Sequence, residues 1–354
     1  MGPEGPLAAG IADRFIANKL AIFGATRTAA EIESSKVFAK DLMQRHCIPC
    51  ARSASFSNFE QASSYVQKQE PPIVIKADGL AAGKGVIIAE SVSQAQETLS
   101  SMMVSRTFGA AGSRVVIEEF LYGREMSFFV FSDGQMILPM VPACDYKRIY
   151  DGNTGPNTGG MGSYSPPPFF NQSLEDVITG TIMQPTVLAL KDENRAYKGV
   201  LYGGLIIINR IPKVIEFNAR MGDPETQVVL PRLKTDIVDA MMAVVNNELD
   251  RIKLEWSEEA CVGVVMASGG YPGSYKTGYP ISGLDDVDRD ILVFHAGTRL
   301  SPEGRVLTSG GRVLTVVATG KDLNEAREKV YDNISRISFD GCYYRKDIAL
   351  ISDR

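Results

Sequence analysis

The chain has 354 residues, 44% of them hydrophobic and 22% charged, a composition typical of globular proteins that excludes a disordered chain or a coiled coil. Its formal net charge of −5 argues against non-specific nucleic-acid binding, although a few lysine and arginine residues could still hold a small anionic substrate. No apolar stretch is long enough to cross a bilayer and residues 1–10 do not resemble a signal peptide, so we expect a cytoplasmic protein without membrane or nucleic-acid partners.

The first residues have the pattern of a small remnant of a larger domain. Residues 2–7 (GPEGPL) have loop composition, and residues 20–23 predict a strand. Because a lone strand cannot bury its apolar face, we expect the chain to begin near the end of a domain. Thr28 and Glu31 then have the spacing of a capping box and predict a helix whose apolar face includes Leu42.

Cys47 and Cys50 form a C-x-x-C pair around Pro49, the spacing of a redox dithiol or of half a zinc site. A structural zinc site would need a second pair, and the other cysteines are solitary: Cys144, Cys261 and Cys342. We therefore favour a helix exit turned by the proline, with no role for the pair.

The next part of the chain predicts a small α+β unit with short connections. Two pairs with capping-box spacing, Ser57/Glu60 and Ser93/Gln96, predict helices. Apolar runs predict strands at 73–76, 86–89, 115–120 and 126–131.

The next segment is a loop rich in Gly, Pro and Asn, residues 145–168, and loops of that length are usually functional or disordered. Apolar patterns beyond it predict helices at 174–190, at 237–245 and from 324 onward. They predict strands at 200–208, 213–218, 262–266, 292–295 and 313–318.

Residues 76–86 (KADGLAAGKGV) join two predicted strands through a glycine-rich loop. Its glycines let the backbone point successive N–H groups at an anion, and Lys84 adds a mobile positive charge. A Walker-type loop needs a longer glycine spacing and a Ser or Thr after the lysine, where this chain has Gly85. We predict a hairpin that covers nucleotide phosphates; a flexible glycine hairpin with an exposed lysine is the alternative.

Residues 213–220 (KVIEFNAR) alternate between polar and apolar side chains. The period of two places Glu216, Asn218 and Arg220 on one face of the predicted strand. Two oxygen ligands on a rigid strand suit a hard cation such as Mg²⁺, and the neighbouring arginine could bind a phosphoryl oxygen or a carboxylate. An ordinary strand with a polar outer face is the alternative.

Together these motifs resemble the glycinamide ribonucleotide synthetase (phosphoribosylamine–glycine ligase) family of the ATP-grasp superfamily. The resemblance runs from residue 2 to the last residues and is carried by segments 74–86, 117–121, 153–162, 215–227, 269–273, 295–298, 310–313 and 345–348. It implies an ATP-grasp fold of the α+β or α/β class, with a truncated N-terminal Rossmann-like domain and a C-terminal α/β subdomain. The expected divisions are 1–50 for the domain remnant and linker helix, 51–135 for the ATP-grasp lid, 136–250 for the large ATP-grasp subdomain with the metal strand, and 251–354 for the C-terminal domain.

The resemblance also implies an activity in purine biosynthesis. Glycine would attack the γ-phosphate of ATP to give glycyl phosphate, and the amine of 5-phosphoribosylamine would displace phosphate to form glycinamide ribonucleotide. The implied cofactors are ATP and Mg²⁺ (or Mn²⁺), and we expect a monomer. Two alternatives are a truncated fragment that binds Mg-ATP without catalysis, and another ATP-grasp carboxylate–amine ligase.

The matched motifs imply a role for each of a set of residues. The implied nucleotide ligands are Lys36, Lys76, Gly79, Gly83, Lys84, Gly85, Glu118, Glu119, Phe120 and Leu121, with Glu125 at the ribose. The implied metal ligands are Glu216 and Asn218, and the implied catalytic residues are Arg220, Asp223 and Lys84. The implied substrate-binding residues are Asp145, Lys147, Arg148, Asn157, Thr158, Gly159 and Gly160.

The sequence departs from the family pattern in two places. The family begins with a complete Rossmann-like domain that helps to bind phosphoribosylamine, and this sequence starts at the end of that domain. Tyr146 stands where the family commonly has histidine. In contrast, residues 201–205 lack an acidic metal ligand that many other ATP-grasp enzymes carry on this strand, and its absence favours this family.

Overall fold

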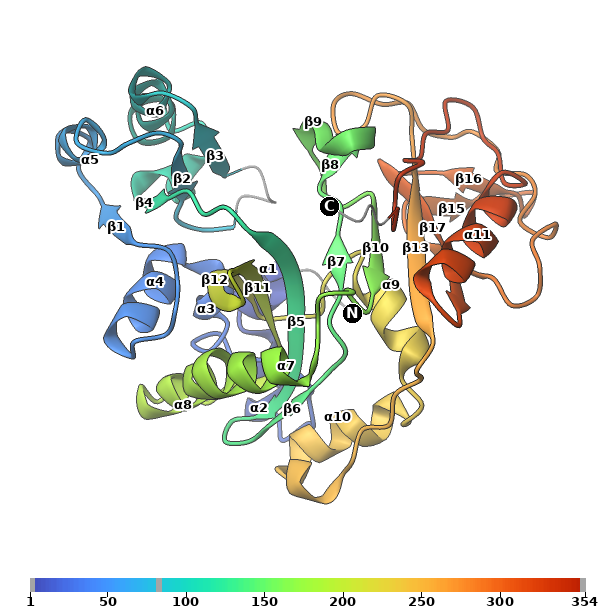
Figure 1. The fold of residues 1–354 in the computed structure, drawn as a ribbon, viewed down its shortest axis with the longest axis horizontal. Coiled ribbons are helices and arrows are strands. Elements are labelled where there is room, and N and C mark those ends of the chain that lie inside the picture. The colour runs from blue at the N-terminus through green and yellow to red at the C-terminus, as the bar shows by residue number, and fades with distance from the viewer. Residues whose placement is uncertain (1–3, 81–84, 351–354) are drawn as a thin grey trace. The chain divides into compact units, whose positions relative to one another are not determined.

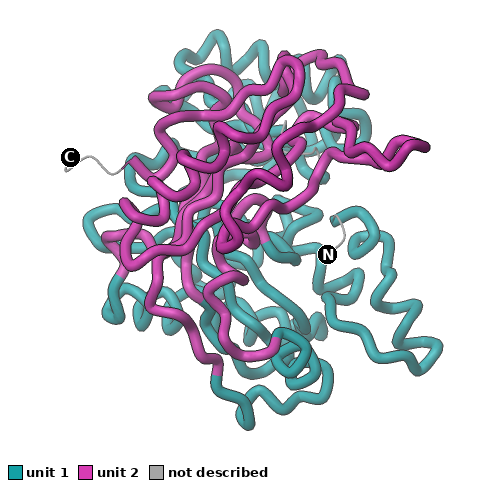
Figure 2. The backbone as a smooth tube through the Cα atoms, turned by 90° about the vertical axis from the view of Figure 1, so that its right-hand side faces the viewer, with its two compact units in different colours: residues 1–140, 171–221, 237–253 teal, residues 141–170, 222–236, 254–354 magenta. Residues whose placement is uncertain are grey.

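The computed structural model describes residues 4–80 and 85–350, which form two compact units (Figure 2). Unit 1 comprises residues 1–140, 171–221 and 237–253. Unit 2 comprises residues 141–170, 222–236 and 254–354. Within the described part of the chain, no helix has both the length and the apolar character needed to span a membrane.

One sheet of unit 1 is a four-stranded antiparallel sheet with the order β1-β4-β2-β3. Its strands are β1 (Ser53–Phe56), β2 (Ile73–Ala77), β3 (Val86–Ala89) and β4 (Val115–Glu119). Helices α5 (Phe59–Val66) and α6 (Val92–Leu99) lie beside it (Figure 1). Alternate strand residues such as Ile75 and Ile117 form a buried cluster with Leu99 of α6, so this sheet has one apolar face covered by helices.

The second sheet of unit 1 has four antiparallel strands in the order β12-β11-β5-β6. Its strands are β5 (Arg124–Asp133), β6 (Ile137–Pro139), β11 (Lys198–Ile208) and β12 (Ile211–Asn218). The helices that contact it are α3 (Glu31–Ser34), α4 (Lys36–Arg45), α7 (Gln172–Ile178) and α10 (Ile237–Asn246). Because α3 and α4 contact β12, the start of α4 is held beside the predicted metal strand.

The remaining elements of unit 1 are short or continue longer helices. They are α1 (Glu4–Ala8), α2 (Ile11–Ala17), α8 (Gln184–Asp192), the π-helices η1 (Ser100–Val104) and η4 (Thr179–Met183), and the 3₁₀ helices η2 (Gly109–Ser113) and η6 (Leu249–Arg251).

Unit 2 is built on a five-stranded sheet with the order β14-β17-β13-β10-β7. Its strands are β7 (Cys144–Asp145), β10 (Gly162–Ser165), β13 (Ala260–Ala267), β14 (Leu292–His295) and β17 (Arg312–Gly320). Helix α11 (Leu323–Ile334) packs on β13 and β17 and forms a buried core with them. The other elements are β8 (Arg148–Tyr150), η3 (Asp151–Asn153), β9 (Thr154–Asn157), α9 (Thr226–Val229), η5 (Leu230–Arg232), β15 (Thr298–Leu300) and β16 (Val306–Thr308).

Three of the predicted elements were wrong. Residues 20–23 form no strand, because no described strand pairs with them and the ring of Phe23 packs against Phe131 instead. The helix predicted from Thr28 is interrupted at Ser35, whose backbone is extended and whose hydroxyl caps a new helix, α4. The long loop at 145–168 contains a β8–β9 hairpin and strand β10.

Candidate functional site

A cavity in unit 1 brings together residues from five separate stretches of the chain. It is lined by residues of α1, of α3 and α4, of both described ends of the glycine-rich loop, of β4, and of the end of β12. Its lining residues are Glu4, Ile32, Glu33, Lys36, Ala39, Lys40, Met43, Lys76, Gly79, Leu80, Gly85, Val86, Glu118, Ile215, Glu216, Phe217, Asn218 and Arg220. The predicted phosphate loop and the predicted metal pair therefore share one cavity.

A buried carboxylate holds two lysines in this cavity. The Glu118 carboxylate on β4 lies 3.0 Å from the ammonium group of Lys76 on β2 and 3.0 Å from that of Lys40 on α4. Burial opposes ionisation of Glu118, but the two ammonium groups hold its pKa below the usual value. Burial lowers the pKa of Lys40, and the Glu118 charge opposes that shift. Two cations against one carboxylate leave a positive balance that favours an anionic ligand.

A β-bulge in β12 turns a backbone carbonyl towards the same lysine. Gly204 pairs with Glu216, whereas Leu205 pairs with Val214, so Ile215 is the extra residue. The Ile215 carbonyl accepts a hydrogen bond of 3.1 Å from the Lys76 ammonium group. The strict alternation that the sequence predicted for this strand is therefore interrupted one residue before the metal pair.

The phosphate loop is also attached to the start of α4. The Asp78 carboxylate accepts hydrogen bonds from the Val37 N–H, at 3.1 Å, and from the Ser35 hydroxyl, at 3.0 Å. The Lys36 ammonium group donates to the Gly79 carbonyl at 3.3 Å. These contacts hold Lys36 beside the entrance to the loop.

Glu216 and Asn218 fit the requirements of a divalent cation. Both side chains are half-buried and line the cavity, and no hydrogen bond or ion pair among the described residues engages either of them. Within residues 4–80 and 85–350, no group of three or more His, Cys, Asp or Glu side chains is arranged to hold a metal. A cation here would therefore complete its coordination with phosphate oxygens and water, as Mg²⁺ commonly does.

A second cluster of charges surrounds the predicted catalytic arginine. The Arg220 guanidinium lies 3.2 Å from the Glu33 carboxylate and 3.4 Å from that of Glu4. Glu33 also accepts a hydrogen bond of 2.8 Å from the Ala219 N–H. Burial raises the pKa of Glu33, and Arg220 opposes that shift. With Glu216, this cluster contains three carboxylates and one guanidinium, an excess of negative charge that suits a divalent cation next to the predicted phosphate-binding lysines.

Four other predicted nucleotide ligands lie outside the lining of this cavity. Glu119 ends β4, while Phe120 and Leu121 follow that strand. Glu125 lies on β5, opposite Ile206 of β11. Gly83 and Lys84 lie outside the described residues. The roles of all these residues remain predictions.

The predicted substrate-binding residues all belong to unit 2. Asp145 on β7 pairs with Lys147 at 3.1 Å, and Arg148 on β8 donates to the Gly155 carbonyl at 2.7 Å. The Thr158 N–H and hydroxyl both donate to the Lys147 carbonyl, at 2.7 and 2.8 Å. Residues 147–158 therefore form a closed hairpin, in which hydrogen bonds join the residues at its start to those at its end.

Gly159, Gly160 and Asp223 are held together within unit 2. Arg312 forms a two-pronged ion pair with Asp223, at 3.1 and 2.7 Å, and donates to the Gly159 carbonyl at 2.6 Å. A Cβ atom on Gly160 would approach Pro224 to 2.3 Å, so this position requires glycine. The predicted catalytic Asp223 is thus joined to the predicted substrate segment by Arg312.

The residues of these clusters that sequence reasoning missed include Lys40, Glu33, Arg312 and Tyr271, whose hydroxyl accepts a hydrogen bond of 2.9 Å from the Gly159 N–H. Lys40 had a usable signal, because it lies four residues after Lys36 and side chains at that spacing share a helix face. The other three lie far in sequence from their partners.

The two cysteines of the C-x-x-C pair take different environments. Cys47 is exposed, whereas Cys50 is half-buried, and burial raises the pKa of its thiol. Both are free thiols.

Comparison with known proteins identifies the family. Residues 34–226 match the phosphoribosylglycinamide synthetase ATP-grasp (A) domain, and residues 261–351 match the C domain of the same synthetase. The phosphoribosylamine–glycine ligase of Halalkalibacterium halodurans is 50% identical over 348 residues, which cover 98% of this chain and 81% of that protein. The corresponding ligase of Caldanaerobacter subterraneus is 49% identical over 349 residues, covering 99% of this chain and 83% of that protein.

Comparison with solved structures leads to the same family. The phosphoribosylamine–glycine ligase of Thermotoga maritima superposes with a TM-score of 0.86 at 34% identity, covering 95% of this chain and 84% of that one. A biotin carboxylase domain of Hydrogenobacter thermophilus shares the fold, with a TM-score of 0.72 at 14% identity over 96% of this chain and 74% of that one. These findings confirm the predicted ATP-grasp fold, and the chain belongs to the phosphoribosylglycinamide synthetase family of ATP-dependent ligases.

Proposed function

We propose that this protein ligates glycine to 5-phosphoribosylamine at the expense of ATP, giving glycinamide ribonucleotide, ADP and phosphate. The observation that carries the proposal is the cavity of unit 1, in which phosphate-loop residues, buried lysines and an oxygen pair on β12 line the same space. The ligases among its relatives cover the chain almost completely, and no comparison supports a non-catalytic fragment or a different ligase.

The first half-reaction activates the carboxyl group of glycine. A glycine carboxylate oxygen attacks the γ-phosphorus of ATP, the bond from that phosphorus to the β-phosphate oxygen breaks, and ADP leaves. Lys36 and Lys76 would neutralise negative charge on the nucleotide phosphates. Phosphoryl transfer of this kind depends on such positioning and charge neutralisation, and it needs no nucleophilic side chain from the protein. We assign Arg220 to the transferring phosphoryl group or the glycine carboxylate, because a guanidinium binds either in a fork geometry.

Glu216 and Asn218 would hold the divalent cation. When bound, a cation of this kind screens the charge of the phosphates and helps to fix their geometry. We propose Mg²⁺, or Mn²⁺ in its place, because both favour oxygen ligands. The available oxygens of Glu216 and Asn218 support this assignment.

The second half-reaction forms the amide bond. The amine nitrogen of phosphoribosylamine attacks the carbonyl carbon of glycyl phosphate, the bond to the phosphate oxygen breaks, and the amine loses a proton. We assign the binding of these substrates to the segment from Asp145 to Gly160, together with Asp223. The contacts of Arg312 with both Gly159 and Asp223 support a joint role.

An assay of ADP release tests the proposal. ADP release that requires ATP, glycine and phosphoribosylamine together is the expected result. Release that needs glycine but not the amine would show activation of the carboxyl group alone. Nucleotide binding without release under any combination would contradict the proposed function. The expected monomer and cytoplasmic location remain predictions, which size-exclusion chromatography and cell fractionation would test.

A further inference from the structure

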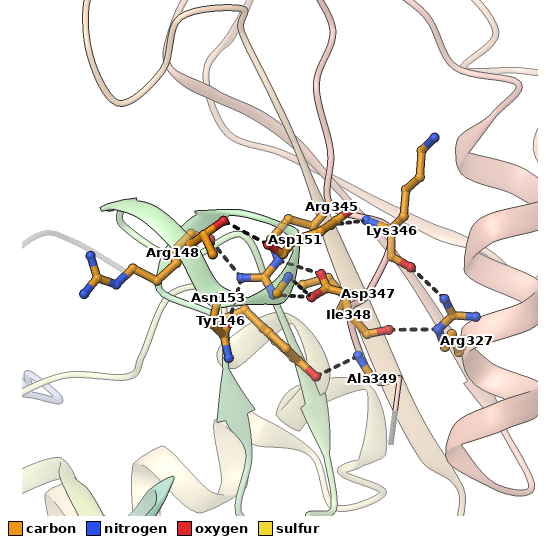
Figure 3. Close-up of polar contacts among 12 residues, drawn as sticks. Tyr146, Arg148, Asp151, Asn153, Arg327, Arg345, Lys346, Asp347, Ile348 and Ala349 are labelled. Atoms are coloured by element: carbon orange, nitrogen blue, oxygen red, sulfur yellow. Dashed lines mark hydrogen bonds and ion pairs between the residues drawn. The ribbon is translucent and has the colours of Figure 1, made fainter. Parts of the chain in front are cut away.

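Arg345 is a completely buried arginine whose hydrogen bonds all go to its own unit. Its guanidinium donates to both oxygens of the Asp347 carboxylate, at 2.7 and 2.6 Å. It also donates to the Arg148 carbonyl at 2.9 Å and to the Asn153 side-chain oxygen at 3.0 Å (Figure 3). The guanidinium carbon lies 4.7 Å from the centre of the Tyr146 ring.

The backbone around Arg345 makes further contacts with the same hairpin. The Lys346 N–H donates to the Asp151 carboxylate, and the Gly152 N–H donates to the Asp347 carboxylate, each at 2.9 Å. The Tyr146 hydroxyl accepts from the Ala349 N–H at 3.1 Å. Residues 345–349 therefore contact strand β8, the η3 turn of the β8–β9 hairpin, and Tyr146, which lies two residues before that hairpin (Figure 3).

The opposite side of residues 345–349 is attached to helix α11. Arg327 donates to the Ile348 carbonyl at 3.1 Å and to the Lys346 carbonyl at 2.6 Å. The Tyr331 hydroxyl donates to the Arg345 carbonyl at 2.7 Å. Because α11 packs on the central sheet of unit 2, this segment connects the hairpin to the core of that unit.

We propose that Arg345 is a positioning residue for the substrate loop, which it holds in place by joining the β8–β9 hairpin to the C-terminal segment. The proposal rests on the proposed function, because the loop comprises the assigned substrate residues Lys147, Arg148 and Asn157 to Gly160. Of these assigned residues, Arg345 reaches Arg148, and only at its backbone carbonyl, so it acts by holding the loop in place.

The chemistry of the site requires arginine. A lysine side chain would offer a single compact ammonium group. The Arg345 guanidinium forms a bidentate ion pair with Asp347 and still donates hydrogen bonds to Arg148 and Asn153. The hairpin also offers little apolar anchoring of its own: of residues 148–157, only Ile149 is buried. Removing the Arg345 guanidinium should therefore increase the mobility of the hairpin more than that of the rest of unit 2.

The test uses the full chain with two variants, Arg345→Lys and the milder Asn153→Gly. Asn153→Gly removes one hydrogen-bond acceptor of Arg345, and glycine readily adopts the positive φ of 55° that Asn153 has. This variant should therefore fold even if Arg345→Lys does not. Arg336→Lys is the matched control, because Arg336 pairs with Asp288 in the same unit but on its surface.

Steady-state ADP release is measured while each substrate is varied in turn. For both variants we expect the KM for glycine or for the amine to rise at least ~10-fold, the equivalent of about 1.4 kcal/mol, while the KM for ATP stays within about twofold. Arg336→Lys should leave the KM values for glycine, the amine and ATP unchanged. Unchanged KM values, with kcat reduced only in proportion to the folded fraction, would assign Arg345 a purely structural role and overturn the proposal.

Hydrogen exchange provides a readout that does not depend on activity. Amides of residues 148–157 should exchange at least ~10-fold faster in both variants than in the wild type, and those of α11 should not. Unchanged exchange in the hairpin would overturn the proposal. A wild-type chain that never releases ADP would contradict the proposed function alone, and faster exchange in the variants would still support the anchoring by Arg345.

Discussion

The ammonium group of Lys76 donates a hydrogen bond to the backbone carbonyl of Ile215, 3.1 Å away and 139 residues later in the chain. Lys76 precedes the glycine-rich loop, and Ile215 immediately precedes the predicted metal ligand Glu216. This single contact therefore links the predicted phosphate loop to the strand that carries the predicted metal ligands. A bulge makes it possible, because Ile215 has no partner of its own in the β11–β12 ladder.

Replacing Lys76 with Met should weaken nucleotide binding. The change removes a buried charge that faces the cavity, and a charged hydrogen bond is worth about 1.5–3 kcal/mol, so we expect a loss of ~10- to 100-fold in ATP affinity. Calorimetric titration with ATP measures it. Lys191→Met is the control, because Lys191 bonds to Gln135 on the surface of the same unit. Unchanged affinity of the Lys76 variant would remove this residue from the nucleotide site.

Glu118→Gln should destabilise unit 1. The substitution leaves the buried Lys40 and Lys76 ammonium groups without their carboxylate, and breaking a buried ion pair in this way costs about 3–5 kcal/mol. Urea unfolding measures the change. Glu193→Gln, which removes a surface carboxylate paired with Arg45, should cost less than about 1 kcal/mol. An equal loss of unfolding free energy in the two variants would show that the buried cluster stabilises the protein no more than a surface ion pair does.

Glu216→Gln should impair metal binding without unfolding the protein. The side chain forms no ion pair among the described residues, so its replacement breaks no internal contact, but it removes the charged member of the predicted pair. We expect the metal concentration needed for half-maximal ADP release to rise roughly 10- to 100-fold. The Glu248→Gln variant, altered at a surface ion pair with Arg251, should behave like the wild type. Wild-type metal dependence in the Glu216 variant would show that the metal assignment is wrong.

The Arg345–Asp347 pair should contribute stability that acid removes. Burial alone would raise the pKa of Asp347, but hydrogen bonds from Arg345 and from the Gly152 N–H hold it below the ordinary value of 3.8. A carboxyl group with a lowered pKa in the folded state stabilises the protein above the unfolded value and loses that contribution as the pH falls through the folded one. The difference in unfolding free energy between the wild type and Asp347→Asn should therefore be constant between about pH 5 and 7 and shrink below pH 3.8. A difference that stays constant down to pH 3 would contradict this.

Several elements could be predicted from sequence because their signals are local. The apolar runs of β2, β3 and β4 and the apolar periodicity of α10 each reflect a few consecutive residues, and the structure places these elements within a few residues of the prediction. Segments with a weak local pattern were missed. Strand β1 has the sequence SASF, with a single large apolar residue, and the β8–β9 hairpin is rich in glycine and polar residues, so tertiary contacts rather than propensity decide their conformation.

Helix boundaries depended on which of several side chains took the capping position. Asn58, not Ser57, caps α5, and Ser91, not Ser93, caps α6. Each alternative has a suitable oxygen, and the packing of the helix on its sheet selects between them.

The sequence by itself determined the family, and it predicted the phosphate loop and the polar pair on β12, because each of these is a run of adjacent residues whose chemistry depends on order and spacing. Only the tertiary structure decided that Glu118 carries two lysines, that Arg220 meets Glu33, and that Arg345 anchors a hairpin nearly two hundred positions earlier. Those partners are distant in the chain, and a buried charge selects its counter-charge through the fold, which brings together groups that no local pattern connects.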